Sequence, residues 1–474
     1  MELLFGVSNF GKIEHAEITL SDFTLFVGDN NSGKTFVMQL LYGVLKELRN
    51  AKPVLKGIEE HGEKELTYGV EWLKNVETQM NDYLSKNKKK IIRGIFHKDI
   101  AIEQLYFHMV NMDEIYVCEV NECEYDEFSG DEEGVVKKVQ GMDADIYIAD
   151  VNVKSREKRS SILFGYRPDR ESLKQILAGQ IWKMILLLGN TENVVGRQKE
   201  DTLFLPASRT GLQLLSKYFF AERDRKAVYE IDNFDFDFGD EDGEDIKDVT
   251  DNELGLTMPI YDFLQFLLRY NRRAGLVQRN KNLLRFIERH LIDGQVKHVG
   301  DEIYYHPDGM PEEKEDIPVY LASSLVNEIT PIIKALSGGK NYRYIFYDEV
   351  ETCLHPLKQG EMARLIVRLV NSGRRMVVST HSDTMAGKLN NLLLLSFSED
   401  SEEERKEKLK KLGLSKEDLL SGAKVHVYQF VNRPDGSSYV EELKFQTMPY
   451  VGYDFKLFMR SLDELYHETD IILK

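Results

Sequence analysis

Short apolar runs alternate along this chain with longer stretches in which apolar residues recur at helical spacing. The first example is the apolar run at residues 24–27, which a polar turn separates from a stretch with a helical repeat. The apolar residues of that repeat are Val37, Leu40, Leu41, Val44, Leu45 and Leu48. The stretches 344–347 and 374–380 predict two further buried strands. Strands that alternate with amphipathic helices predict an α/β fold.

The rest of the pattern predicts elements on both sides of these strands. They are a strand at 145–149, a helix at 173–188, a hairpin at 304–320, a helix at 322–336, a charged helix after residue 397, strands at 425–431 and 439–445, and a last helix. The two late strands are joined by the turn Arg433–Gly436. The helix at 322–336 has an apolar face formed by Leu325, Ile329, Ile332, Ile333 and Leu336.

Changes in pattern divide the chain into five segments. We expect residues 1–50 to begin the core and residues 301–396 to complete it. Residues 51–211 combine core strands with an insertion, residues 212–300 hold an acidic loop and a helical insertion, and residues 397–474 form a C-terminal helix–hairpin–helix segment.

Composition narrows the class of protein. The chain has 474 residues with 42% hydrophobic content, enough for two or more cores. No apolar run approaches the roughly 18 residues of a membrane span, and the N-terminus has no signal pattern. Three cysteines make no disulfide framework and no zinc motif. We therefore expect a cytoplasmic protein without a membrane partner or a structural metal.

Charge is uneven along the chain. The net charge is −18, and residues 232–253 hold eleven acids and one Lys, which gives that tract −10 and leaves −8 for the rest. Two stretches are basic, residues 86–93 and residues 269–289, and the second holds only one acid, Glu288. Two interpretations of the basic stretches stay open. They contact phosphates of DNA or tRNA, or they form a solvated helical arm.

A phosphate-binding loop joins the first strand to the first helix. Residues 28–35 read Gly-Asp-Asn-Asn-Ser-Gly-Lys-Thr and fit G-x-x-x-x-G-K-[ST]. In a strand–loop–helix context, successive backbone N–H groups and a helix N-terminus surround a phosphate. We expect ATP to be held by Gly28, Asn30, Asn31, Ser32, Gly33, Lys34 and Thr35. Lys34 would reach the β- and γ-phosphates, and Thr35 would ligate Mg²⁺.

Two carboxylates and a histidine complete the predicted site. Asp348 and Glu349 end the strand at 344–347, and His381 follows the strand at 374–380. Asp348 would hold Mg²⁺ through water, and Glu349 would deprotonate the attacking water. His381 would bind the γ-phosphate or the same water. Its alternative role is that of an ordinary histidine at a strand end.

These motifs together resemble the ABC-type ATPases. The resemblance rests on the phosphate loop, on the stretch Asp348–Pro356 and on Ser379–Asp383. It is nearest to the branch of RecF, the SMC-like repair ATPases and the OLD-like AAA-family ATPases of bacterial antiphage systems. The resemblance implies an ABC-ATPase head, which is a P-loop core with a mixed sheet, here with a helical insertion and a C-terminal α+β segment. It also implies a homodimer or higher homo-oligomer in which two heads enclose two ATP molecules.

Such a dimer needs a signature helix that completes the partner's site, and the chain offers two candidates. The run Leu336–Lys340 looks like the signature sequence, but Gly339 lies only nine positions before Asp348, with no room for the intervening helix. We therefore assign the signature to Ser323 and Ser324, which lie 25 and 24 positions before Asp348, at the start of the helix at 322–336. The Leu-Ser-Gly-Gly run is then the end of that helix, with glycine as a left-handed cap.

A third stretch, Phe204–Gly211, resembles a segment of the antiphage ATPases. We expect a strand to deliver Arg209 to the nucleotide or to the dimer interface, because its planar guanidinium binds phosphate. The alternative is a strand–helix junction with a solvated arginine.

The resemblance extends most closely to the stand-alone ATPase subunits of Septu-type and PARIS-type antiphage systems. Only 93 residues follow His381, and they contain neither a Toprim metal-binding pattern nor an H-N-H pattern. The resemblance therefore implies an ATPase sensor that controls a separate effector nuclease of the Toprim or HNH type, with a phage protein as trigger. The alternative is a RecF-like or SMC-like DNA-repair ATPase that binds DNA directly. A transport ATPase is disfavoured because no glutamine loop matches.

Overall fold

The computed structural model describes residues 2–62, 65–112, 115–123, 146–153, 158–164, 169–186, 200–216, 255–299, 302–420, 422–446, 452–455, 466–468 and 470–471. The acidic tract 232–253 and most of the stretch expected to hold the last helix lie outside these residues. No helix within the described ranges is both long and apolar enough to cross a membrane.

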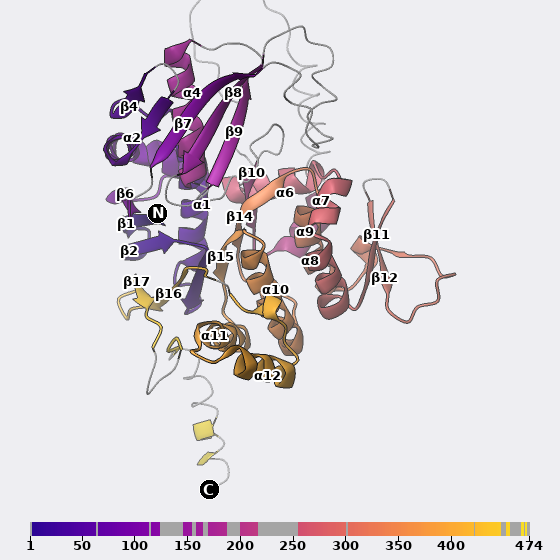
Figure 1. Cartoon of the computed structure of the whole chain (residues 1–474). Helices are drawn as coiled ribbons and strands as arrows, with labels where there is room; N and C mark the ends of the chain where they lie inside the picture. The colour runs from indigo at the N-terminus through magenta and orange to yellow at the C-terminus, as the bar shows by residue number, and fades with distance from the viewer. Residues whose placement is uncertain are drawn as a thin grey trace, which may run out of the picture.

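A mixed sheet of nine strands forms the centre of the molecule (Figure 1). From one edge to the other the strands are β10 (Glu200–Leu205), β14 (Asn341–Tyr347), β15 (Arg375–Ser379), β3 (Phe23–Gly28), β16 (Val425–Asn432), β17 (Ser438–Leu443), β2 (Ile13–Leu20), β1 (Glu2–Phe10) and β6 (Gln104–Val110). The first five run parallel to one another, whereas β16–β17, β2–β1 and β1–β6 pair antiparallel. Because the first five strands are parallel, their carboxyl ends meet at one edge of the sheet.

Helices cover both faces of this sheet, so its central strands bury side chains on both sides. In β14, Tyr344 and Phe346 belong to one apolar core, and Ile345 and Tyr347 belong to the other. The first core is covered by α1 (Lys34–Asn50), α2 (Val70–Phe96) and α4 (Arg170–Leu186). The second is covered by α6 (Met258–Leu268), α8 (Lys281–Phe286), the π-helical turn Ile287–Leu291, α9 (Ser324–Ser337), α10 (Pro356–Asn371) and α11 (Asp383–Phe397). The six apolar residues predicted for the face of α1 are all buried.

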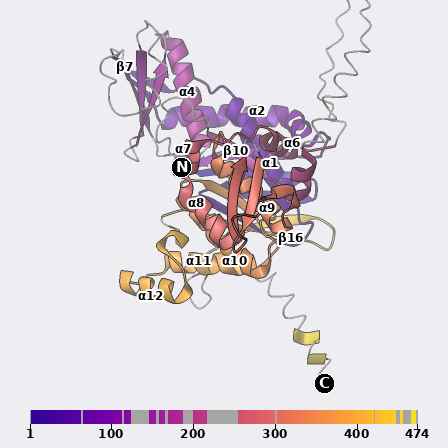
Figure 2. The ribbon, with the colours of Figure 1, turned by 90° about the vertical axis from the view of Figure 1, so that its right-hand side faces the viewer.

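A smaller antiparallel sheet is inserted between α1 and β10. Its strands, in order, are β4 (Ile58–His61), β5 (Glu65–Tyr68), β7 (Tyr116–Cys123), β8 (Ile146–Val153) and β9 (Lys158–Phe164). Figure 1 shows this sheet and α4 at one end of the molecule, with α10, α11 and α12 (Glu402–Leu412) at the other. The perpendicular view shows α2 crossing the body beside the end that carries the small sheet (Figure 2). The strand predicted at 145–149 and the helix at 173–188 are confirmed.

The basic stretch at 269–289 does not form a solvated arm. It spans α7 (Ala274–Arg279), α8 and the following π-helical turn, whose apolar residues pack into the second core. Among these buried residues are Leu283, Phe286 and Ile287. The cations remain on the outward face, so the insertion is a layer of the body.

The predicted hairpin at 304–320 is confirmed, with a third strand added. β12 (Glu302–Pro307) pairs with the two-residue strand β13 (Ile317–Pro318), and β11 (Gly294–Val299) pairs with the other edge of β12. The short helical turn Val319–Leu321 then leads into α9.

The late hairpin differs from the prediction in its place. β16 and β17 pair as predicted, but they lie in the middle of the central sheet, between β3 and β2. The hairpin therefore completes the core and is not part of a separate C-terminal segment. β15 pairs with one edge of β3, and β16 pairs with the other edge. The apolar residues of β16, such as Val427 and Phe430, are buried at this position.

Candidate functional site

The phosphate loop has a backbone that only glycine tolerates at two positions. Gly28 has φ 128° and Gly33 has φ 98°, both in the left-handed region. A Cβ atom at Gly28 would collide with the backbone carbonyl of Phe430 in β16. The late hairpin thus fixes the loop's first glycine, a contact that the sequence pattern did not reveal.

The loop ends at a helix N-terminus that the protein leaves without a cap. Gly33 is the N-cap of α1, and no side chain accepts a hydrogen bond there. No acidic residue lies in the first turn of α1. The free N–H groups and the positive end of the helix dipole therefore remain for an outside anion. This arrangement fits the phosphates of ATP.

Two residues far away in sequence brace the tip of the loop. The Asn432 side-chain amide donates to the carbonyl of Asn30 at 3.0 Å, and the Lys12 ammonium donates to the carbonyl of Asn31. Lys12 also donates to Asn432 Oδ1 at 2.7 Å. Within the loop, Ser32 Oγ donates to the Asp29 carbonyl at 2.7 Å. Lys12 and Asn432 lie outside every motif of the sequence, so no local pattern predicts their contact with the loop.

Lys34 lies inside the loop and is 3% exposed. Its ammonium donates to the carbonyls of Gly28 at 2.9 Å and Asp29 at 2.7 Å. Burial lowers the pKa of Lys34 to about 8, although nearby carboxylates, Asp348 foremost, oppose that shift. The cation is thus kept at the place where a phosphate would enter.

Thr35 and Asp348 meet as the sequence predicted. Thr35 Oγ1 donates to Asp348 Oδ2 at 2.9 Å, and Ser379 Oγ donates to Asp348 Oδ1 at 2.5 Å. Asp348 is 1% exposed, and burial raises its pKa despite these two hydrogen bonds. A hydroxyl and a carboxylate form the oxygen donor set that Mg²⁺ prefers. Ser379, at the end of β15, is a further site residue that the sequence analysis did not single out.

Glu349 and His381 lie beside this pair. Glu349 Oε1 is 3.6 Å from His381 Nε2, and His381 Nδ1 is 3.3 Å from the Lys34 ammonium. Because an ammonium can only donate, Nδ1 accepts and the ring proton lies on Nε2, facing Glu349. The hydrogen bond with His381 is the main cause that lowers the pKa of Glu349. Glu349 is therefore a carboxylate at neutral pH, the form that a general base requires.

Arg209 is placed beside the site but is neither solvated nor free. Its side chain is 0% exposed, forms an ion pair with Glu328 of α9, and lies 4.6 Å from the ring centre of Tyr347. Its guanidinium donates to the carbonyls of Asp348 at 2.5 Å and Glu349 at 3.0 Å. The alternative of a solvated arginine is wrong. The guanidinium holds the turn after β14 through its two Nη groups, while Nε is buried without a hydrogen-bond partner among the described residues.

The helix predicted at 322–336 is present as α9. Ser323 is its N-cap and accepts from the backbone N–H of Val326, and Ser324 is exposed in the first turn. No hydrogen bond joins either serine to residues 28–35 within the described part of the chain. Both side chains are thus exposed to solvent at the N-terminus of α9.

The second candidate serine is closed off. Ser337 is 1% exposed, and its hydroxyl donates to the Ile333 carbonyl at 2.7 Å. Gly338 does end the helix, but the predicted left-handed cap is wrong, because its φ is −85° and its backbone is extended. A Cβ atom at Gly338 would lie 2.7 Å from the Lys334 carbonyl. Close packing, and not a left-handed turn, requires glycine at this position.

Comparison with known proteins agrees with an ATPase fold. Residues 5–182 match the family model of the AAA ATPase domain. None of the curated proteins matches the chain. This match and the mixed sheet between two helical layers confirm the predicted α/β ATPase head.

Solved structures similar to this chain include three SMC heads. The head domain from Thermotoga maritima is 13% identical, with 94% of this chain and 100% of that chain covered and a TM-score of 0.31. The head with an extended coiled coil from Pyrococcus furiosus, bound to the C-terminal domain of ScpA, is 13% identical, with 98% of each chain covered and a TM-score of 0.33. The head with a coiled coil and joint from Pyrococcus yayanosii is 13% identical, with 98% of this chain and 99% of that chain covered and a TM-score of 0.35.

The burial of Arg209 leads to a prediction about stability. Arg209→Ala should lower the free energy of unfolding by about 3–5 kcal/mol, because it leaves the buried Glu328 charge without its counterion. Urea denaturation followed by tryptophan fluorescence would measure the loss. Arg269→Ala is the matched control, since Arg269 is exposed, and it should change stability by less than about 0.5 kcal/mol. A loss of that small size for Arg209→Ala would contradict the structural role.

Proposed function

We propose that this chain binds and hydrolyses ATP at the carboxyl edge of the parallel strands. The observation that carries the proposal is the convergence of Lys34, Thr35 and Asp348 on the uncapped N-terminus of α1. Lys34 and Thr35 come from the first turn of α1 and Asp348 follows β14, and they supply the cation, the hydroxyl and the carboxylate that nucleoside triphosphate sites use.

Each residue has a proposed role in that reaction. Lys34 contacts the β- and γ-phosphates, and the loop N–H groups bind the phosphate oxygens. Thr35 and Asp348 would hold Mg²⁺, which neutralises charge on the phosphates. Glu349 takes the proton of the attacking water, and His381 Nε2–H orients Glu349 or the γ-phosphate.

We further propose that two copies of the chain complete each other's sites. Support comes from Ser323 and Ser324, which lie exposed at the positive end of α9 with no bond to their own phosphate loop. A second chain's triphosphate would supply the anion that this helix end attracts. Glu328, one turn further along α9, is paired with Arg209 and so links that helix to the turn that carries Glu349.

At the level of the cell, we propose an ATPase sensor of an antiphage system that controls a separate effector nuclease of the Toprim or HNH type. The support is the resemblance of the phosphate loop, the A-S-S helix and the L-H-P and T-H-S-D stretches to the ATPase subunits of Septu-type and PARIS-type systems. A phage protein is the proposed trigger.

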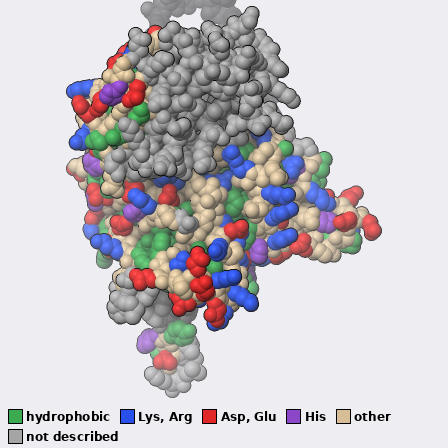
Figure 3. All heavy atoms as spheres, in the orientation of Figure 1, with side chains coloured by type: hydrophobic (Ala, Val, Ile, Leu, Met, Phe, Trp, Pro, Cys, Tyr) green, Lys and Arg blue, Asp and Glu red, His purple; other side chains and the backbone are tan. Residues whose placement is uncertain are grey.

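One observation favours the alternative of direct DNA contact. The outward face of α7 and α8 exposes a group of cations, and Figure 3 shows Lys and Arg side chains gathered on that side of the body. They are Arg272, Arg273, Arg279, Lys281, Arg285 and Arg289. Such a face suits a phosphate backbone, with a strong dependence on salt.

The buried Lys34 predicts a pH dependence for ATP binding. Without nucleotide, Lys34 loses its proton as the pH rises through about 8. Since phosphate favours the charged form, binding above that pH takes up a proton, and affinity should fall by up to about tenfold per pH unit. Below pH about 8 the affinity should be level. Isothermal titration across this range would measure it.

Two variants test the cause of that dependence. Lys34→Ala should abolish binding, because the loop loses its cation. Lys34→Arg keeps its charge to high pH, so any binding it retains should lose the pH dependence. An unchanged profile in Lys34→Arg would show that another group titrates.

Glu349→Gln should separate binding from hydrolysis. The amide keeps the shape of the side chain but cannot accept the proton, so hydrolysis should slow by at least about 100-fold while ATP still binds. The closed dimer should then accumulate with ATP, as measured by light scattering. Hydrolysis at the wild-type rate would move the role of base to another residue.

A second substitution tests the dimer contact in the same background. Adding Ser324→Arg to Glu349→Gln should return the protein to its ATP-free oligomeric state. Ser85→Arg is the matched control, an exposed serine on α2, and should leave the dimer intact. If Ser324→Arg has no effect, the signature assignment is wrong.

The effector proposal predicts that nuclease activity needs a second protein. The purified chain with Mg²⁺ or Mn²⁺ and ATP should leave plasmid, linear DNA and tRNA intact. Copurification with the product of the neighbouring gene should yield a stable complex that cuts. Cleavage by the chain alone that survives Glu349→Gln would contradict this function, and tight salt-dependent DNA binding without a partner would favour the alternative.

A further inference from the structure

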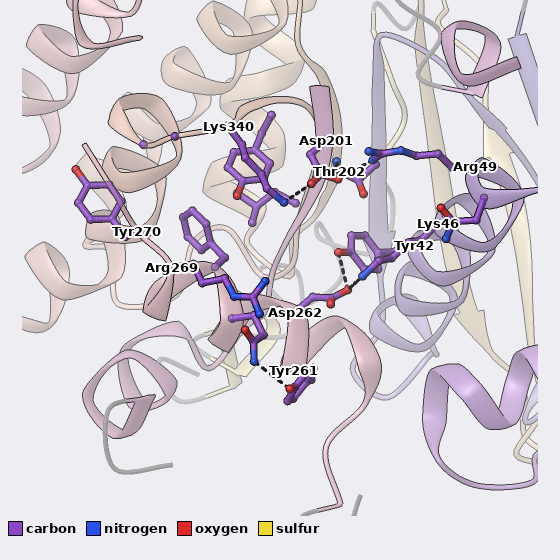
Figure 4. A pocket seen from close by; sticks show the side chains of 17 residues that line it. Tyr42, Lys46, Arg49, Asp201, Thr202, Tyr261, Asp262, Arg269, Tyr270 and Lys340 are labelled. Carbon is purple, nitrogen blue, oxygen red and sulfur yellow. Dashed lines mark hydrogen bonds and ion pairs between the residues drawn. The ribbon is translucent and has the colours of Figure 1, made fainter. Parts of the chain in front are cut away.

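A cavity of about 470 Å³ lies between α1, α6, the start of β10 and the loop after α9 (Figure 4). It has no part in the proposed ATP site. The phosphate loop and Asp348 lie at the carboxyl ends of the parallel strands, whereas Asp201 and Tyr342, which line the cavity, lie at the amino ends of β10 and β14. Its volume is in the range of pockets that hold small organic ligands.

The charges of the cavity favour an anion. Four cations line it and two carboxylates oppose them, which leaves a formal charge of +2 in a chain whose total is −18. The cations are Lys46, Arg49, Arg269 and Lys340, and the carboxylates are Asp201 and Asp262.

The two carboxylates are already committed to protein partners. Asp201 pairs with Arg49 at 2.6 Å and with Lys340 at 2.7 Å, and Asp262 pairs with Lys46. Burial raises the pKa of Asp201, but the hydrogen bond from Lys340 and the charge of Arg49 outweigh it, so the net pKa is lowered. Figure 4 shows Lys340 and Arg49 approaching Asp201 from opposite sides.

Unused binding capacity remains at the rim. Arg269 is exposed, and its guanidinium has no hydrogen bond or ion pair within the described residues. The Lys340 side chain is 53% exposed, so its ammonium has donors to spare besides the one that reaches Asp201. A phosphate between Arg269 and Lys340 would receive hydrogen bonds from both, and arginine's planar fork suits that group.

The interior of the cavity suits a flat ring with polar edges. Phe266 packs edge-on against Tyr342 at 5.5 Å between ring centres, and both residues line the cavity with Tyr261. The Gln265 amide donates to the Tyr261 hydroxyl at 2.9 Å, while its Oε1 has no partner among the described residues. If the Gln265 amide is flipped, Oε1 accepts from the Tyr261 hydroxyl and Nε2 is the atom without a partner. In either orientation, a polar group of the ligand can form a hydrogen bond with the unpaired atom.

We propose that this cavity is a second, regulatory nucleotide site that takes a nucleoside monophosphate, with the phosphate between Arg269 and Lys340 and the base among the aromatic side chains. This site does not depend on the proposed ATPase function. Its ligand class follows from the combination of a net positive rim, aromatic walls and a free amide atom.

Three elements connect the two sites. α1 begins at Lys34 in the phosphate loop and carries Lys46 and Arg49 in its last turns, about 18–23 Å along at 1.5 Å per residue. β10 begins at the cavity and leads to Arg209, and β14 begins there and leads to Asp348. A ligand that shifts α1 or these strands therefore changes the affinity of the ATP site, and the reverse must hold by linkage.

The test is a direct binding measurement on the full chain with Lys34→Ala, which removes the ATP site. AMP and GMP, titrated by calorimetry, should bind this variant, and inorganic phosphate should bind at least about tenfold more weakly because it lacks the ring. Adding Lys340→Glu or Arg269→Glu should weaken AMP and GMP binding by about tenfold or more, the scale of one lost charged hydrogen bond.

Lys314→Glu is the matched control, an exposed lysine in the loop between β12 and β13, and it should leave binding unchanged. The proposal is overturned if neither nucleotide binds, if binding survives both charge reversals, or if phosphate binds as tightly as AMP. The ATPase proposal would be contradicted by a different result. That result is ATP binding that persists in a variant with Lys34→Ala and both charge reversals.

Discussion

The geometry of the site depends on the buried positive charge of Arg209, which requires a counterion and hydrogen-bond acceptors. Arg209 is fully enclosed, and moving an arginine out of water is costly unless its charge and its donors are all paired. The structure supplies Glu328 as the counterion and the carbonyls of Pro206, Asp348 and Glu349 as acceptors, while Nε has no hydrogen-bond partner among the described residues. One side chain thereby joins the end of β10, the turn after β14 and the helix α9. Because a displacement of any of the three would expose or unpair the charge, their relative positions are fixed, and the carboxylates that face Thr35 and His381 are fixed with them.

The order of strands explains how residues more than 300 positions apart form one site. β14, β15 and β3 are parallel neighbours, so the residues that follow their carboxyl ends lie together at one edge. Asp348 follows β14, Ser379 ends β15, and the phosphate loop follows β3. β16 continues the same parallel pattern on the other side of β3, and its backbone at Phe430 sets the space available to Gly28.

Local sequence patterns predicted the individual parts of the site but not the long-range contacts that hold them in place. The phosphate loop, the face of α1 and the strand before Asp348 follow from short-range rules, glycine positions and hydrophobic period, and these predictions are confirmed as structure. The partners of Arg209, the insertion of β16 beside β3, and the role of Lys12 and Asn432 depend on strand order across the whole chain. No local rule encodes that order. The prediction for Gly338 was wrong for the same reason. Glycine is required there because a Cβ atom would lie too close to the Lys334 carbonyl and the Tyr270 ring, and not because the backbone makes a left-handed turn.

Glu349 shows how this bracing connects to reactivity. It is one of the few described residues other than glycine with positive φ, at 43°, a conformation that costs an ordinary residue about 1–2 kcal/mol. The restraints that hold it there include the hydrogen bond from its N–H to Ser379 Oγ at 2.8 Å and the hydrogen bond from Arg209 to its carbonyl, which also accepts from Thr352. The second restraint depends in turn on Glu328, which lies one turn from the exposed start of α9. A second chain that pressed on the start of α9 would therefore act on the Glu328–Arg209 pair, and through it on the strained residue that positions the proposed base. Contact between subunits and the geometry of hydrolysis would then be coupled by a path of three side chains, without any rearrangement of the sheet.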